Sequence, residues 1–347
     1  MKPQLLHEFQ RLREANPTLR AVDAARSLDV SEGELLEVRC GHGDVFRLAL
    51  RGSEFRNLLE ELKKVGPVMT LTRNDSAVHE TKGPIGSIEV HKAIGQITGK
   101  IDLRLFMNHW HVGYHVTEPT NSGTKSSFQI FNVEGKSVLK IFELQATDKE
   151  AWAAAAQLFV DKTKAVIAFS PPGTKSIDRD DAEIDVEELR ARWRTLTHSH
   201  DFFGVLRDLE VGRLQALRLA GPEFAEEVKV ERIQGLLEGA AEHDIPIMCF
   251  VGNPGCIQIF SGGIERVAMV GPWLNILDDS FNLHLRTDMV ASAWVVRKPT
   301  STRGLITSIE LFDQDREMVC QFFGERPPGE TERQAWRSLA ENLCAET

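Results

Sequence analysis

Two short stretches of this 347-residue chain decide its fold, FQIFN at residues 128–132 and IELFD at residues 309–313. Each is an apolar run that ends in a turn-forming residue, which is typical of a buried strand. The two stretches lie 181 residues apart, and the same offset relates LKIF at 139–142 to CQFF at 320–323. An offset that recurs in this way indicates that the chain contains two copies of one unit.

Two further matches extend the repeat toward the N-terminus of each copy. DLRL at 102–105 corresponds to NLHL at 282–285 at an offset of 180, and TRN at 72–74 corresponds to VGN at 251–253 at an offset of 179. The strand-like segments are closely spaced, and short turns can join only antiparallel neighbours. We therefore predict an α+β fold with an internal duplication, in which each repeat has a large antiparallel β-sheet flanked by helices.

A Pro- and Gly-containing segment, SPPGTK at 170–175, separates the two copies. It cannot continue a helix or a strand, and the charged residues after it keep it solvated. We therefore predict an N-terminal repeat at 1–165, a linker at 166–184 and a C-terminal repeat at 185–347.

The periodicity of apolar residues predicts the elements of the first copy, and the second copy is expected to repeat them. Helices are expected at 3–15, 18–37 and 148–164. Strands rich in Val, Ile and Phe are expected at 44–50, 67–73, 85–92, 100–106, 110–117, 127–133 and 137–144.

Composition excludes several classes of protein. The net charge of −10 makes most of the surface repel nucleic-acid phosphates, so we expect no nucleic-acid partner. The five cysteines form no CxxC pair, which indicates reduced thiols. No signal peptide is visible, and no segment approaches the ~20 apolar residues that cross a bilayer. We expect a soluble, cytoplasmic protein without membrane insertion.

The first candidate site is THSHDFF at 197–203, where His198 and His200 lie at a break between two helical stretches. Ser199 is the expected cap of the second helix, and Phe202 and Phe203 would form an apolar wall. A neutral imidazole is a common ligand of haem iron. The alternative is that both histidines are ordinary surface or cap residues.

The second candidate site is a set of cations, namely Arg104, Arg213, Lys298 and Arg326. Haem carries two propionates, and burying them requires Arg or Lys partners. Arg104 and Lys298 fall within or at the end of predicted strands, where a charge is costly unless it faces a site. The alternative is that these cations form ion pairs at strand edges or across strands.

Two other motifs carry less weight. His109 and His111 have the spacing of zinc ligands on one face of a strand, but no further ligands follow, and half-buried strand histidines are the favoured interpretation. Residues 20–36 imitate a helix-turn-helix, but its recognition helix at 31–38 is acidic and would be repelled by phosphate.

Five segments in this order resemble the HemS-like family of bacterial haem-binding and haem-trafficking proteins, also called hemin-degrading factors. The resemblance extends over nearly the whole chain and includes both repeats. The segments are LRLF at 103–106 with His109-Trp110, THSHDFF at 197–203, RLQALR at 213–218, AWVVRKPT at 293–300 and QFFGER at 321–326.

The resemblance implies a haem site beside the C-terminal repeat, with b-type haem as ligand or substrate. It implies that His200 is the proximal iron ligand. His198 departs from the family pattern, because relatives often have a carboxylate at that position, and it is the alternate iron ligand of this chain. Phe323 stands where some relatives have tyrosine, so a phenolic hydroxyl is absent. The positions that match haem-contacting residues of the family are Arg104 on the distal side, its neighbour Phe106, Arg213, Lys298, Gln321, Phe323 and Arg326.

The resemblance also implies a function in iron acquisition. A carrier would sequester imported haem and deliver it for iron release to a downstream haem oxygenase or another acceptor. The alternative is a haem-degrading enzyme that opens the macrocycle itself, with Arg104 over the open coordination position. A lesser alternative is a regulatory or interaction module without haem. The residues leave open the choice between carrier and enzyme, a second haem in the N-terminal repeat, and the oligomeric state.

Overall fold

The computed structural model describes residues 2–17, 19–120, 123–163, 166–173, 178–327 and 329–345. The helices of the first half are α1 (Lys2–Ala15), α2 (Ala21–Ser27), α3 (Glu32–Arg39), α4 (Phe55–Leu62) and α5 (Lys149–Leu158). Its strands are β1 (Val45–Arg47), β2 (Pro67–Arg73), β3 (Ala77–Pro84), β4 (Ser87–His91), β5 (Ile94–Thr98), β6 (Asp102–Phe106), β7 (Val112–Thr120), β8 (Gly123–Phe131) and β9 (Ser137–Glu143).

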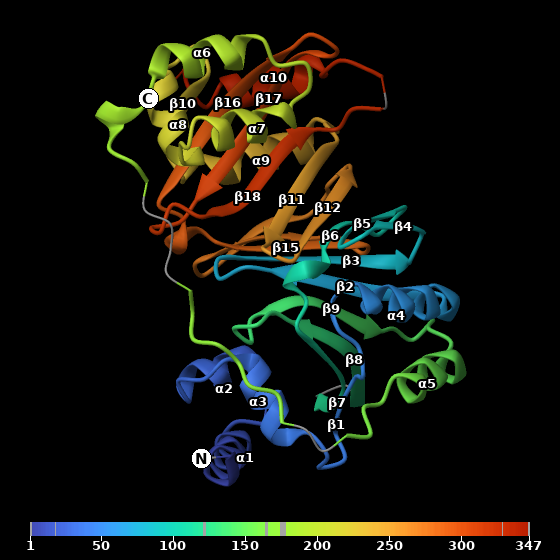
Figure 1. The fold of residues 1–347 in the computed structure, drawn as a ribbon. Coiled ribbons are helices and arrows are strands. Elements are labelled where there is room, and N and C mark those ends of the chain that lie inside the picture. The colour runs from blue at the N-terminus through green and yellow to red at the C-terminus, as the bar shows by residue number, and fades with distance from the viewer. Residues whose placement is uncertain are drawn as a thin grey trace. The chain divides into compact units, whose positions relative to one another are not determined.

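The second half repeats this order of helices and strands (Figure 1). Its helices are α6 (Val186–Arg194), α7 (Asp201–Asp208), α8 (Arg213–Ala220), α9 (Arg232–Glu242) and α10 (Gln334–Glu341). Its strands are β10 (Ala225–Val228), β11 (Ile247–Asn253), β12 (Cys256–Gly262), β13 (Val267–Val270), β14 (Trp273–Leu277), β15 (Phe281–Arg286), β16 (Ser292–Thr300), β17 (Gly304–Phe312) and β18 (Met318–Gly324).

Two nine-stranded sheets confirm the predicted duplicated α+β fold. Their strand orders are β1-β7-β8-β9-β2-β3-β15-β14-β13 and β10-β16-β17-β18-β11-β12-β6-β5-β4, so each strand holds the same place as its counterpart. The duplication extends to an irregularity. The β8–β9 ladder shifts register between Ile130 and Phe131, and the β17–β18 ladder shifts between Leu311 and Phe312. These four residues lie in the two stretches that first indicated the repeat.

The chain divides into two compact units, and each unit includes a short turn from the other half. Unit 1 contains Met1–Arg73, Glu80–Thr174 and Gly252–Gln258, whereas unit 2 contains Asn74–His79, Lys175–Val251 and Ile259–Thr347. The exchanged turns, between β2 and β3 and between β11 and β12, are related by the offset of 179 found in the sequence. The predicted repeats, by contrast, are continuous in sequence.

In unit 2, β16 and β17 bury side chains on both faces. Val295 and Ile309 point to one face and pack with Ile233 of α9. Trp294 and Val296 alternate with them and point to the opposite face, where α6, α7 and α8 lie (Figure 1). Because successive strand side chains alternate between faces, a sheet covered on both sides needs the nearly continuous apolar run found at 293–296.

Several predicted elements differ from those observed. The 18–37 stretch forms two helices, because Asp29 adopts a positive φ of 53° and Ser31 begins α3 with a capping box to Glu34. Helix α4 and strands β3 and β5 were not predicted. Strand β3 was missed because it buries polar residues, including His79 and Thr81, and so lacks an apolar pattern.

No helix among the described residues combines the length and the apolar composition that a bilayer crossing requires. The five cysteines are free thiols, and Cys249, Cys256 and Cys320 are buried, in line with the expected reduced state.

Candidate functional site

The histidine segment forms the connection between α6 and α7 in unit 2. His200 is the N-cap residue of α7, but its side chain makes no capping bond, and it is exposed. The cap is instead closed by Asp201, whose Oδ2 accepts from the backbone nitrogen of His198 at 2.7 Å while its own backbone nitrogen donates to the His198 oxygen at 3.0 Å. The prediction that Ser199 caps this helix was therefore wrong.

His198 also touches the turn between β16 and β17. Its Nδ1 lies 3.1 Å from Oγ1 of Thr302, and the same Oγ1 donates to the main-chain oxygen of Thr197 at 2.7 Å. The backbone nitrogen of Ser301 donates to the Leu196 oxygen at 3.0 Å. Three bonds therefore fix the histidine segment against this turn.

A buried carboxylate gathers two of the predicted cations. Glu310 of β17 is fully buried and accepts from Nε and Nη2 of Arg213, both at 2.7 Å, and from Nζ of Lys298 at 2.8 Å. The Ser308 hydroxyl adds a bond of 3.1 Å. Arg213 and Lys298 thus form the ion pairs that the alternative interpretation expected. The cluster still holds two cationic groups against one carboxylate.

The burial and the charges of this cluster shift its pKa values in a consistent way. Burial lowers the pKa of Lys298, Glu310 opposes this and Arg213 adds to it, with a result of about 8. Burial alone would raise the pKa of Glu310, but Arg213 and Lys298 outweigh it and hold that pKa well below its ordinary value. Glu310 is therefore an anion at every physiological pH, and the cluster has a surplus positive charge while Lys298 is protonated.

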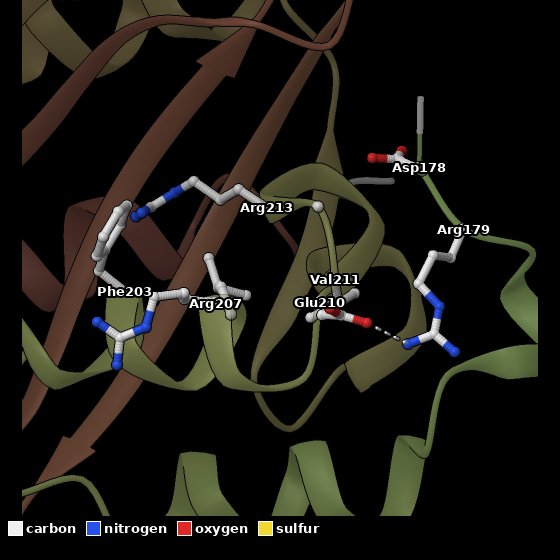
Figure 2. Close-up of a pocket in the computed structure, with 9 residues that line it drawn as sticks. Asp178, Arg179, Phe203, Arg207, Glu210, Val211 and Arg213 are labelled. Carbon is white, nitrogen blue, oxygen red and sulfur yellow. Dashed lines mark ion pairs between the residues drawn. The ribbon is translucent and has the colours of Figure 1, made fainter. Parts of the chain in front are cut away.

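Aromatic side chains of α7 lie beside these cations. The Arg213 guanidinium carbon is 5.4 Å and the Lys298 Nζ is 5.1 Å from the ring centroid of buried Phe202. Phe203, the next residue of α7, is 69% exposed. Its side chain and that of Arg213 both line the cavity drawn in Figure 2.

Phe203 and Arg213 line one part of a cavity of about 440 Å³. Arg179 and Glu210, 3.5 Å apart, form an ion pair elsewhere along its wall (Figure 2). The other lining residues are Asp178, Leu206, Arg207, Val211 and Gly212. The cavity is therefore mixed in charge and rich in arginine.

Gln321 and Phe323 lie on one face of β18 and are only half-buried. Phe322, between them, points the other way into the core of unit 2. On the neighbouring strand, Phe250 packs edge-to-face against Phe323 with ring centroids 5.2 Å apart, and it too is half-buried. This part of the sheet face offers a flat, partly apolar surface that α6–α8 leave accessible.

Arg326, just beyond β18, differs from the other predicted cations. Its Nε and Nη1 atoms are buried and have no hydrogen-bond partner among the described residues. Burial lowers the pKa of its guanidinium, Glu332 opposes this, and Arg303 adds to the lowering. Glu332 is itself engaged by the Thr307 backbone nitrogen at 2.6 Å and by Arg337 at 3.0 Å. A buried guanidinium in this state is suited to an anion supplied from outside the chain.

Arg104 and Phe106 are located in unit 1, on β6. Arg104 forms an ion pair with Asp102, two residues away on the same face of the strand, and its side chain is 38% exposed. Burial raises the pKa of Asp102, and Arg104 opposes the rise. Phe106 is half-buried, and its backbone nitrogen donates to the Gly255 oxygen at 3.0 Å.

The structure brings His198, Arg213, Lys298, Gln321, Phe323 and Arg326 into unit 2 together with His200, whereas Arg104 and Phe106 belong to unit 1. Sequence reasoning missed Glu310 and Glu332. The signal for Glu310 was present, because a single carboxylate inside the apolar run IELF needs a buried cation nearby.

The weaker motifs find no support as sites. His109 belongs to a 3-10 turn, Met107–His109, and β7 begins only at Val112, so His109 and His111 do not share a strand face. No cluster of three or more His, Cys, Asp or Glu residues suited to a metal ion occurs in the described ranges. In α3, Glu32 is buried and paired with Lys140 at 2.9 Å and also with Arg73, so this helix is packed into unit 1.

The chain is similar in sequence and in fold to known proteins. Over 99% of both chains, the chain is 42% identical to the crystallised holo form of PhuS, a heme-binding protein from Pseudomonas aeruginosa, with a TM-score of 0.94. It is 32% identical to a structure titled as ChuS, an E. coli heme oxygenase, over 98% of this chain and 99% of that one, with a TM-score of 0.87.

A curated relative, the hemin transport protein HmuS of Yersinia pestis, is 35% identical over 99% of this chain and 98% of its own length. Residues 29–159 and 210–343 each match the haemin-degrading HemS.ChuX domain. Two matches to one domain are the expected outcome for a duplicated chain. The chain therefore belongs to the haemin-degrading HemS.ChuX family.

Proposed function

We propose that this chain is a haem-binding protein that carries haem for iron acquisition. The observation that carries the proposal is Arg326, whose buried Nε and Nη1 atoms lack a partner among the described residues. Leaving such donors unpaired costs about 1–3 kcal/mol or more, and a carboxylate ligand removes that cost. A haem propionate is a carboxylate of this kind.

The remaining residues of unit 2 fit the other parts of haem. His200 is exposed at the start of α7 and can supply an imidazole nitrogen to iron. The half-buried faces of Phe250 and Phe323 and the exposed ring of Phe203 suit an apolar macrocycle. The surplus positive charge at Glu310, with Arg213 and Lys298, favours the second propionate.

The relatives support the same ligand. The Pseudomonas protein is described as heme-binding, and the Yersinia protein is described as a hemin transport protein. We propose that the chain acts in the cytoplasm and passes haem to a downstream haem oxygenase or to another acceptor.

Haem degradation is the second candidate function, because the E. coli relative is described as a heme oxygenase. Bound haem would supply the redox chemistry of oxygen. Arg104 is the residue of this chain proposed to act by hydrogen bonding on the distal side, since a guanidinium keeps its proton and donates only. Its ion pair with Asp102 would hold it in place.

An absorption titration of the full-length protein with hemin tests the proposal. We expect a saturable Soret shift at one equivalent. In His200→Ala we expect an altered band and at least tenfold weaker binding, and in the double variant His198→Ala/His200→Ala no iron ligation by imidazole. Exposed His243 provides the control, His243→Ala, which should titrate like the unmodified protein. The absence of a saturable shift in the unmodified protein would refute haem binding.

The same samples separate carrier from enzyme. Loaded protein is given a physiological reductant under air, with catalase present to remove free peroxide. An intact Soret band supports carriage, whereas conversion to a linear tetrapyrrole supports degradation.

A further inference from the structure

We propose that Thr302 is a positioning residue that fixes the tautomer of His198, so that the Nε2 atom of His198 carries the free lone pair and is ready to bind iron. The proposal rests on the proposed haem-binding function for the identity of the metal. The tautomer of His198 is a property of the protein without ligand, so this part of the proposal is independent of haem binding.

The tautomer of His198 follows from the hydrogen bonds of the Thr302 hydroxyl group. A threonine hydroxyl has one proton to donate and two lone pairs to accept with. Oγ1 of Thr302 lies 2.7 Å from the main-chain oxygen of Thr197, and a carbonyl oxygen can only accept. The single hydroxyl proton is therefore used there. The 3.1 Å contact between Oγ1 and Nδ1 of His198 must then run the other way, with Nδ1 as donor.

A neutral imidazole has one protonated and one unprotonated nitrogen. If Nδ1 holds the proton, Nε2 is the nitrogen that can ligate a metal. Histidines that bind metals nearly always donate their other ring N–H to a fixed acceptor, which sets both tautomer and ring orientation. His198 has such an acceptor in Thr302. Among the described residues, no comparable bond is found for the ring of His200.

The loops that hold the two side chains are fixed independently of this bond. The backbone nitrogen of Ser301 donates to the Leu196 oxygen at 3.0 Å, and the turn itself is closed by Oγ1 of Thr300, which donates to the Gly304 oxygen at 2.8 Å. On the other side, Asp201 holds the backbone of His198. Removing the Thr302 hydroxyl should thus release the His198 ring without unfolding either segment.

Two consequences follow for the site. The chain has a second imidazole nitrogen, two residues from His200, that is already in the tautomer iron requires. Because Thr302 is in the turn between β16 and β17, a sheet turn far along the sequence determines the chemistry of the histidine segment.

The first test measures the tautomer directly. Nitrogen-15 histidine NMR of the full-length protein without haem, at a pH where His198 is neutral, is compared for the unmodified chain, Thr302→Val and Thr302→Ser, with His198→Ala used to assign the signal. We expect the Nδ1-protonated form of His198 in the unmodified protein and in Thr302→Ser, and a shift toward the Nε2-protonated form in Thr302→Val. A predominantly Nε2-protonated His198 in the unmodified protein, or identical spectra in all three, would overturn the proposal.

The second test uses hemin titrations in the His200→Ala background, where His198 is the imidazole left in the segment. We expect Thr302→Val to weaken binding by about tenfold, as losing a partner of a metal-bound histidine usually does, and Thr302→Ser to restore it. Equal affinities with Val and Ser would overturn the role of Thr302 in ligation. Failure of the unmodified protein to bind hemin would instead refute the proposed function, and the NMR result would still decide the tautomer.

Discussion

The side-chain Nδ2 of Asn253 lies 2.9 Å from the main-chain oxygen of Val138, 115 residues earlier in the chain. The other half contains the same bond, 2.8 Å from Nδ2 of Asn74 to the oxygen of Val319. In both halves the asparagine Oδ1 also accepts two backbone N–H groups of its own turn. One asparagine in each half therefore shapes an exchanged turn and attaches it to the unit that receives it.

Replacing Asn253 by Ala is expected to lower stability. The change removes the bonds to Val138 and Arg73 and the two bonds that shape the turn. At about 1 kcal/mol for each net bond, with partial replacement by water, we expect a loss of about 2–3 kcal/mol. Thermal unfolding should show a midpoint several degrees lower. Asn253→Asp keeps the acceptor but places a carboxylate oxygen, which cannot donate, against the main-chain oxygens of Arg73 and Val138, so it should not restore the midpoint. An unchanged midpoint for Asn253→Ala would contradict the assignment.

Arg326→Gln is expected to weaken haem binding, because it removes the proposed partner of a propionate carboxylate. Because the buried Nε and Nη1 atoms are proposed to bind a propionate, the variant should bind hemin about tenfold more weakly and should bind haem dimethyl ester as the unmodified protein does. Absorption titrations with both ligands measure this. The matched control is Arg333→Gln, an exposed arginine of the same segment. An equal loss for acid and ester would show that Arg326 acts by packing.

Porphyrin affinity is expected to fall as the pH rises through about 8. Below this pH, Lys298 and Arg213 place two positive charges against the single charge of Glu310. Above it, Lys298 loses its proton, and the surplus positive charge that attracts a propionate is gone. Fluorescence titration with iron-free protoporphyrin IX avoids hydroxide binding to iron. Lys298→Met should bind more weakly at pH 7 and show no step near pH 8, and a step that persists in this variant would exclude Lys298 as its source.

His79 is expected to make the protein sensitive to acid. Burial lowers the pKa of His79 from 6.5 to about 3 in the folded chain. Between these values the unfolded chain takes up a proton that the folded chain does not, so stability falls as the pH drops below 6.5, by up to about 1.4 kcal/mol per pH unit. Urea unfolding at pH 5 and pH 7 should show a smaller difference in His79→Leu than in the unmodified protein. The exposed-site control His243→Gln should keep the full difference, and an equal difference in His79→Leu would rule out this source.

The sequence predicted the duplication because repeated apolar runs determine strands locally, and the offsets of 179 to 181 are visible without coordinates. It did not predict the exchange of turns, since Asn74 and Asn253 form the same local turn whichever unit receives it. It proposed His200 and Arg326 as haem contacts, which stay predictions, and it missed the partners that distinguish the cations. Glu310 approaches Arg213 only through tertiary packing, since the two are 97 residues apart, and Glu332 accepts from the backbone of Thr307, 25 residues before it. The role of Thr302 likewise depends on a contact with a residue 104 positions away in sequence.

The reciprocal turns also bear on what a protease can do to this protein. Each unit includes a turn from the opposite half of the chain, so the two units are not independent domains joined only by a linker. A single cleavage between residues 166 and 184 would break the covalent connection between the two halves. Both exchanged turns, Asn74–His79 and Gly252–Gln258, would remain in the units that receive them. The nicked protein should therefore keep its two fragments associated, as an interlocked pair in which neither fragment can leave without unfolding part of its neighbour.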